Sequence, residues 1–298
     1  MENKKFLKAL ELINSHLLGL DVKCAYNSIG SNIFVNFGRE NEFTFPNGKK
    51  DTKFEWRIWI GDASWRLTRN NQYLIGSGED PEISIHDFIQ KLLTKRLESL
   101  KFLSQFLDIE LSFEDDYKIT TFFNWFGENQ WCIFLPNYPE ISVDCETKEA
   151  IASLQRLSKE VEVQSKYQVF DQSLIVMITD VVYDKNNGVQ LIGTNDFLFD
   201  LGASGWRLEK NGEYLFGQTD YYFRKEEGRD KAFKAKLSKL IGEKIKNIEI
   251  DHSGMDVKVQ LDSEYILETF TDNATFPWKI IYKEKKILSP RNLRDCEK

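Results

Sequence analysis

The chain has 298 residues, 41% hydrophobic and 29% charged, a composition typical of a folded protein of about two domains. Its formal net charge of −7 argues against nonspecific binding to nucleic acid and favours attraction to a basic protein. We find no apolar run of about 18 residues and no secretory leader, so we expect a protein without a membrane span. Four dispersed cysteines without metal-binding spacing fit the reducing cytoplasm.

Hydrophobic periodicity predicts the first elements in chain order. Apolar side chains at helical spacing predict a helix over residues 6–18. Alternating apolar positions then predict strands over residues 33–37 and 54–60.

A hairpin follows, with strands at Trp65–Arg69 and Gln72–Gly76 joined by two asparagines. A two-residue loop predicts that Trp65 lies opposite Gly76, so that the indole covers the glycine backbone. It also predicts Arg66 on the other face, opposite Ile75.

A second helix is predicted over residues 84–93, with Ser84 as its N-cap. Strands are then expected over 97–102, 109–113 and 118–123, with an acidic turn at Glu114, Asp115 and Asp116. A final short strand carries Trp131.

The second half of the chain repeats this pattern. Residues 61–76 match residues 202–217 at a constant offset of 141, and residues 91–121 match residues 239–269 at an offset of 148. The change of offset places seven extra residues in the second copy, between the two blocks. We therefore expect a tandem duplication with repeats at residues 1–145 and 146–298. The predicted fold class is α+β, each repeat having a mainly antiparallel sheet with two helices packed on one face.

The segment Leu240–Ile250 is followed by a hydrophobic strand, an acidic turn and Trp278. This pattern resembles small bacterial α+β domains of unknown function, some of which lie among immunity-like proteins of toxin–immunity and defence gene clusters. The resemblance implies a binding role and brings no catalytic residues with it. The first copy departs from the pattern, because Thr94 stands where the second copy has Gly242.

Residues for catalysis or metal binding are sparse. Of three histidines, His252 lies in the sequence Asp251-His252-Ser253-Gly254, which fits either a polar loop or part of a hydrolytic group. No spacing typical of a metal site or a phosphate loop occurs, so we expect neither a metal nor a cofactor.

Two aromatic segments differ between the copies. Trp125 and Phe126 have no aromatic counterparts in the second copy, and acidic residues surround them in the sequence, among them Asp115, Asp116 and Glu128. An aromatic anchor with a carboxylate rim fits a binding site for a basic partner, although a local core is the alternative. Tyr221, Tyr222 and Phe223 form the second segment, for which a partner contact or packing within the protein both remain open.

Arg66 and Arg207 are polar residues that both copies share. They fit either an anion or partner contact or an arginine whose stem covers apolar surface.

Together these features favour a non-enzymatic protein-binding module, of the bacterial immunity or defence-accessory kind, that neutralises or organises a partner such as a basic toxin or effector. One alternative is a structural subunit in which the duplication replaces a homodimer. Another is a hydrolase with a site between the repeats. The oligomeric state is left open.

Overall fold

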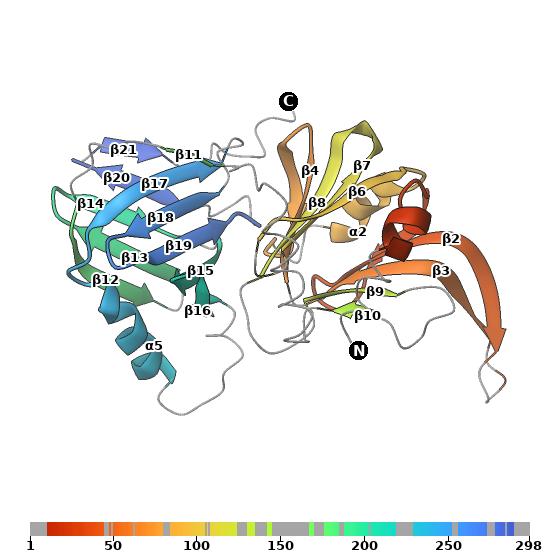
Figure 1. Cartoon of the computed structure of the whole chain (residues 1–298), viewed down its shortest axis with the longest axis horizontal. Helices are drawn as coiled ribbons and strands as arrows, with labels where there is room; N and C mark the ends of the chain where they lie inside the picture. Colours follow the sequence, from red (N-terminus) through yellow and green to blue (C-terminus); the bar gives the residue numbers. More distant parts are fainter. Residues whose placement is uncertain are drawn as a thin grey trace. The chain divides into compact units, whose positions relative to one another are not determined.

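The chain forms two compact units in the computed structural model, with elements η1 to β10 in the first and β11 to β21 in the second (Figure 1). The structure describes residues 11–44, 48, 50–61, 63–79, 84–104, 106, 108–123, 130–134, 142–144, 167–169, 176–184, 188–202, 204–218, 229–251, 256–272, 278–283 and 285–288.

The first unit consists of two five-stranded antiparallel sheets. The first sheet has the order β1-β2-β3-β9-β10, with β1 (Val22–Asn27), β2 (Ile33–Thr44), β3 (Lys50–Ile60), β9 (Trp131–Phe134) and β10 (Ser142–Asp144). The second has the order β5-β4-β8-β7-β6, with β4 (Ser64–Arg69), β5 (Gln72–Gly76), β6 (Leu97–Phe102), β7 (Ile109–Phe113) and β8 (Tyr117–Phe122). The described helical segments are short: η1 (Ile13–Leu17), α2 (Ile85–Ile89), η2 (Gln90–Leu92) and η3 (Glu114–Asp116).

The second unit repeats this topology. Its first sheet has the order β12-β13-β14-β20-β21, with β12 (Ile178–Asp184), β13 (Gly188–Gly193), β14 (Phe197–Asp200), β20 (Lys279–Tyr282) and β21 (Lys285–Leu288). Its second has the order β11-β17-β18-β19-β15-β16, with β11 (Tyr167–Val169), β15 (Gly205–Lys210), β16 (Glu213–Gly217), β17 (Ile245–Asp251), β18 (Val257–Leu261) and β19 (Tyr265–Phe270). The helical segments are α5 (Arg229–Leu237) and η4 (Ser238–Leu240). Only β11 lacks a counterpart among the described strands of the first unit.

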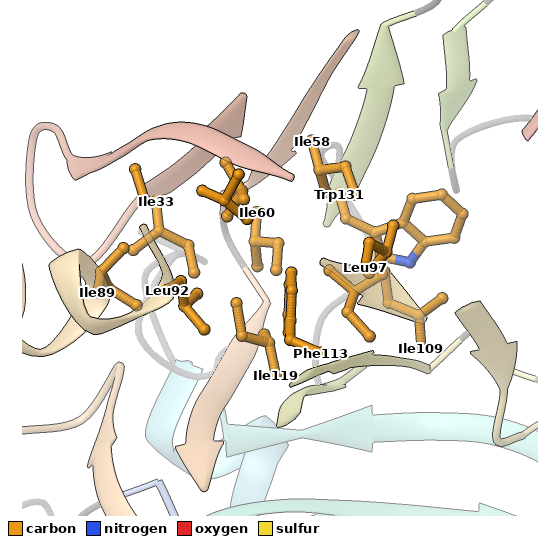
Figure 2. Packing of buried hydrophobic residues seen from close by; sticks show 14 of the residues in the cluster. Ile33, Ile58, Ile60, Ile89, Leu92, Leu97, Ile109, Phe113, Ile119 and Trp131 are labelled. Atoms are coloured by element: carbon orange, nitrogen blue, oxygen red, sulfur yellow. The ribbon is translucent and has the colours of Figure 1, made fainter. Parts of the chain in front are cut away.

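The core of each unit lies between its two sheets. In the first unit Ile33, Ile58 and Trp131 of one sheet meet Leu97 and Ile119 of the other, and all are at most 1% exposed (Figure 2). Ile89 of α2 and Leu92 of η2 join the same cluster. The second unit has an equivalent cluster from both sheets, α5 and η4.

The predicted α+β class is therefore wrong, because each unit is mainly β, with two sheets packed on each other. The periodic apolar positions predicted the strands, but alternation does not show to which sheet a strand belongs. A second sheet covers the face that we had assigned to helices. The helix predicted over 84–93 shortens to α2 and η2, although Ser84 does cap it by accepting a hydrogen bond from the Asp87 amide at 3.3 Å.

Irregularities in the strands recur at equivalent positions of the two units. Register shifts occur in three pairs of matching places: at residues 22–24 and 178–180, at 67–68 and 208–209, and at 97–99 and 245–247. Because a bulge needs a specific local backbone, this repetition supports the internal duplication at the level of single residues.

The β4–β5 hairpin shows why the predicted register was wrong. Asn70 and Asn71 have positive φ values of 50° and 59°, as the two-residue turn requires. A register shift between Leu67 and Thr68 then leaves Leu74 of β5 as an extra residue, so Leu67 lies opposite Ile75 and Arg66 opposite Gly76. Trp65 instead belongs to the core, fully buried, and its indole N–H donates to the Ser31 carbonyl at 2.7 Å.

Two buried carboxylates hold the end of equivalent strands. Asp108 accepts hydrogen bonds from the Phe123 amide at 2.5 Å and the Ser104 hydroxyl at 2.6 Å. Asp256 accepts one from the Thr271 amide at 3.0 Å, just after β19. The sequence match between these two acids therefore reflects a shared structural role.

The first unit carries a long two-stranded arm that the second lacks. Beyond Phe37, strands β2 and β3 pair with each other over 40–44 and 50–54 and curve away from the sheet (Figure 1). The offset between the copies falls from 156 before the arm to 141 after it, so the arm adds 15 residues. At its base Gly38 adopts φ +78°, and the Glu55 carboxylate accepts from the Arg39 amide and side chain at 3.0 and 3.2 Å.

Candidate partner-binding site

Three aromatic side chains form a ladder across the outer face of the first sheet. Tyr26 of β1 lies opposite Phe34 of β2, and Phe34 lies opposite Trp59 of β3. The Tyr26 and Phe34 rings stack at 5.0 Å between centroids, and the Phe34 and Trp59 rings at 6.5 Å. All three are partly exposed, whereas the neighbouring residues Ala25, Ile33, Val35, Ile58 and Ile60 are buried in the core. We call Tyr26, Phe34 and Trp59 the aromatic ladder.

Arg57 extends this surface. Its guanidinium lies 5.3 Å from the centre of the Phe34 ring, and its Nε donates to Asn36 Oδ1 at 2.8 Å. Asn36 is itself held by a hydrogen bond from its Nδ2 to the Cys24 carbonyl at 3.3 Å. On the far side of Arg57, Phe134 of β9 is 42% exposed. The cation is thus held by the Phe34 ring and Asn36 before any partner arrives.

The Trp59 ring has a defined position because it covers a glycine. A Cβ atom placed on Gly61 would lie only 2.3 Å from Cζ2 of the indole. Any larger residue at position 61 would displace the ring, so Gly61 and Trp59 work as a pair.

The second unit has no aromatic ring at the positions that match the ladder. The positions equivalent to Tyr26, Phe34 and Trp59 hold Val182, Gln190 and Asp200. Asp200 accepts a hydrogen bond from Gln190 Nε2 at 3.1 Å and forms an ion pair with Lys279 at 3.1 Å. The same backbone therefore presents three stacked rings in one unit, and a valine beside a hydrogen-bonded Gln190–Asp200 pair in the other.

The five aromatic candidates predicted from the sequence lie outside the described residues: Trp125, Phe126, Tyr221, Tyr222 and Phe223. So does the acidic candidate Glu128. Sequence reasoning did not find the aromatic ladder, because its members come from three strands whose register was unknown. One signal was present: Trp59 stands at an outward position of an alternating strand, where the aligned residue of the second copy is Asp200.

The acidic turn is described, and its charges are compensated locally. Asp115 forms a hydrogen-bonded ion pair with Lys95, and Glu114 pairs with Arg96 at 3.3 Å. The hydrogen bond from Lys95 holds the pKa of the Asp115 carboxyl below its usual value, and Asp115 raises the pKa of Lys95. Asp116 is exposed in the same turn.

The turn also lies at the far end of β8 from residue 122. A strand of six residues spans roughly 20 Å. The structure therefore does not bring Asp115 and Asp116 beside Phe122, after which the predicted aromatic anchor follows in the sequence.

Arg66 and Arg207 are buried, at 5% and 2% exposure, on the sheet face that points away from the core. They lie opposite Gly76 and Gly217, not opposite Ile75 and Phe216. Arg207 pairs with Glu209 at 3.1 Å and Glu268 at 2.5 Å. For Arg207 the charged partners are two carboxylates of its own sheet.

In the first unit the positions that match Glu209 and Glu268 hold Thr68 and Thr120. Both units thus keep a buried arginine, but its surroundings have changed.

The described residues contain no group of three or more His, Cys, Asp or Glu side chains that could hold a metal ion. Asp251 uses its carboxylate to accept from the Asp256 amide at 3.1 Å, while His252 and Ser253 lie outside the described part of the chain. Among the helices that the structure describes, none is long and apolar enough to cross a membrane.

Comparison with known proteins finds no relative from which a function could be inferred, so the site is the main guide to function. No family model, no curated protein and no solved structure matches the chain.

Proposed function

We propose that the chain is a non-enzymatic protein-binding module whose first unit binds a partner protein through the aromatic ladder and Arg57. The observation that carries the proposal is the contrast between the units: matching positions hold three stacked rings in the first, and Val182 with the hydrogen-bonded Gln190 and Asp200 in the second. Core packing does not require aromatic residues on an outer face, as the second unit demonstrates.

The chemistry of the ladder suits a protein partner. Tyr, Trp, Phe and Arg are the residues enriched at the centres of protein interfaces, where a few side chains carry most of the binding free energy. The net charge of −7 favours a basic partner, since complementary charge accelerates encounter. A bacterial immunity or defence-accessory protein that neutralises a basic toxin or effector is the setting we propose.

The test is binding by matched pairs of substitutions. A partner isolated by co-purification from the native cell is titrated calorimetrically against the purified chain. We expect Phe34→Ala with Trp59→Ala to weaken binding at least about 30-fold, because each lost anchor costs about 1–2 kcal/mol. Gln190→Ala with Asp200→Ala changes the matching positions of the second unit and should leave the affinity within about twofold.

Equal affinity of both double variants would rule out the ladder as the binding surface. Trp125→Ala with Phe126→Ala, measured in parallel, tests the aromatic segment predicted from the sequence. If only that variant loses the partner, binding is retained as the function but moves to the other segment.

A further inference from the structure

One edge of the second sheet carries an added strand in one unit, whereas no described strand covers the equivalent edge of the other. In the second unit β11 pairs antiparallel with the end of β17, with Tyr167 opposite Asp251, Gln168 opposite Ile250 and Val169 opposite Glu249. In the first unit the equivalent strand is β6, and among the described residues the only strand it pairs with is β7.

At the start of β6 and of β17 the two units make the same backbone hydrogen bonds, so the units differ only in the later part of this edge. Backbone hydrogen bonds at 2.8–3.0 Å tie Leu97 to Gly19 and Leu20, just as Ile245 is tied to Val176. The edge beyond Leu97, over residues 98–102, corresponds to the part of β17 that extends to the β11 contact.

The direction of the backbone amides shows that the edge can accept a strand. The Leu103 amide donates inward to the Asp108 carbonyl at 2.8 Å, and the Asp251 amide donates to Asp256 at 3.0 Å. Amides alternate in direction along a strand, so those of Leu100 and Phe102 point outward, as does that of Ile250.

In the first unit, the segment of the chain that matches β11 does not form a strand on this edge. Counting back from β11 by the offset of 156 that relates β12 to β1 gives residues 11–13. These residues are helical, and Ile13 is 1% exposed within the core. Residues 11–13 therefore pack against the core as part of a helix and do not supply an added strand.

We propose that the β6 edge of the first unit binds an extended segment of a partner protein as an added antiparallel strand. Main-chain hydrogen bonds provide affinity in this mode of recognition, and the side chains opposite the edge provide specificity. Leu100 and Phe102 lie on the apolar face, and Phe102 contacts Trp131 at 6.1 Å between ring centres, so an apolar residue fits opposite Phe102. The Lys101 side chain is 64% exposed. Its Nζ lies 4.0 Å from Glu110 Oε1, which is a long distance for an ion pair, so Lys101 is able to attract a carboxylate on the partner strand as well. This site is separate from the aromatic ladder.

Hydrogen exchange of the full chain tests whether the edge is open. The Phe102 amide should exchange freely, whereas the amide of Ile250, covered by β11, should be slower by roughly tenfold or more. A Phe102 amide that is protected in the free chain would overturn the proposal, because the edge would then already be filled by this chain or by a second copy.

A peptide then tests recognition. The probe is a synthetic decapeptide copied from residues 163–172 with Q168V and V169E, which places an apolar residue opposite Phe102 and a carboxylate opposite Lys101. At saturation it should slow exchange at Leu100 and Phe102 by roughly tenfold. A peptide with V169K in place of V169E should bind more weakly.

A surface substitution checks the register without risk to folding. In the chain with Lys101→Glu, the V169K peptide should bind better than the V169E peptide. If the preference does not reverse, or if the peptides protect other amides and not Phe102, strand addition at β6 is wrong. Because neither outcome involves Trp59, the ladder proposal stands or falls separately.

Discussion

The outer faces of the first sheets in the two units differ, although the strands beneath them are the same. In the first unit Tyr26, Phe34 and Trp59 stack in a row. In the second, Asp200 binds Gln190 and Lys279. Inward positions are apolar in both units, so the core explains what they share. The outward differences require another cause, and partner binding is the one we propose.

The second sheets also differ between the units. There the second unit holds a buried ionic group, in which Arg207 lies between Glu209 and Glu268, while the first unit has threonines in place of the two acids. A buried ion pair contributes little net stability but is costly to break. Because only the second unit has this group, removing a charge from it should lower the stability of the second unit, and the matching substitution in the first unit leaves no such unpaired acids.

The largest expected effect therefore comes from Arg207→Met. The substitution leaves two buried carboxylates close together, and we expect the free energy of unfolding to fall by about 3–5 kcal/mol. Urea denaturation followed by fluorescence measures the change. Adding Glu209→Gln and Glu268→Gln to the same chain should recover much of the loss, because the uncompensated charge is removed. No recovery would mean that packing of the arginine stem, and not charge, dominates.

Local chemistry was predictable from the sequence, and long-range register was not. The Asn70-Asn71 and Asn211-Gly212 turns were predicted from residue type, and all four residues have positive φ. The bulges after Leu67 and Leu208 carry no such signal, so every cross-strand pair beyond them was misplaced.

Unknown pairing between distant strands also explains why the sequence analysis missed the ladder and predicted the wrong fold class. Strand alternation places Trp59 outward, but only the pairing of β1, β2 and β3 shows that it stacks on Phe34. Alternation likewise does not reveal that strands separated by 70 residues, such as β3 and β9, share a sheet. Sheet membership depends on tertiary contacts between distant segments.

A smaller effect is expected where the units differ in one turn residue. Thr94 and Gly242 occupy equivalent turns, with φ values of 64° and 90°. A β-branched residue is strained in this region, whereas glycine is not. Since Thr94 is exposed and gives up no core packing, Thr94→Gly should stabilise the chain by about 1 kcal/mol.

The reciprocal change sharpens this comparison. A Cβ at Gly242 would meet nothing within 4 Å, so Gly242→Thr introduces backbone strain without a steric clash. We expect a loss of about 1–2 kcal/mol, measured by the same denaturation. If both swaps leave stability unchanged, the two turns do not carry the strain that their φ values indicate.

The smallest effect concerns the Lys95–Asp115 pair, which only the first unit has, because Glu243 and Ser263 stand at the matching positions. The pKa of Asp115 is lowered on folding, so its contribution to stability is present above its unfolded value of about 4 and is lost as the pH falls through the folded pKa. The pKa of Lys95 is raised, so its contribution is present below about 10.4 and is lost as the pH rises through the folded value. Asp115→Asn should therefore lower the unfolding midpoint slightly at neutral pH, and the difference should shrink as the pH falls toward and below the folded pKa of Asp115. Because the pair is exposed, high salt should reduce the difference at neutral pH. A difference that persists unchanged at low pH would mean that the Asp115 side chain acts through the shape of the turn and not through its charge.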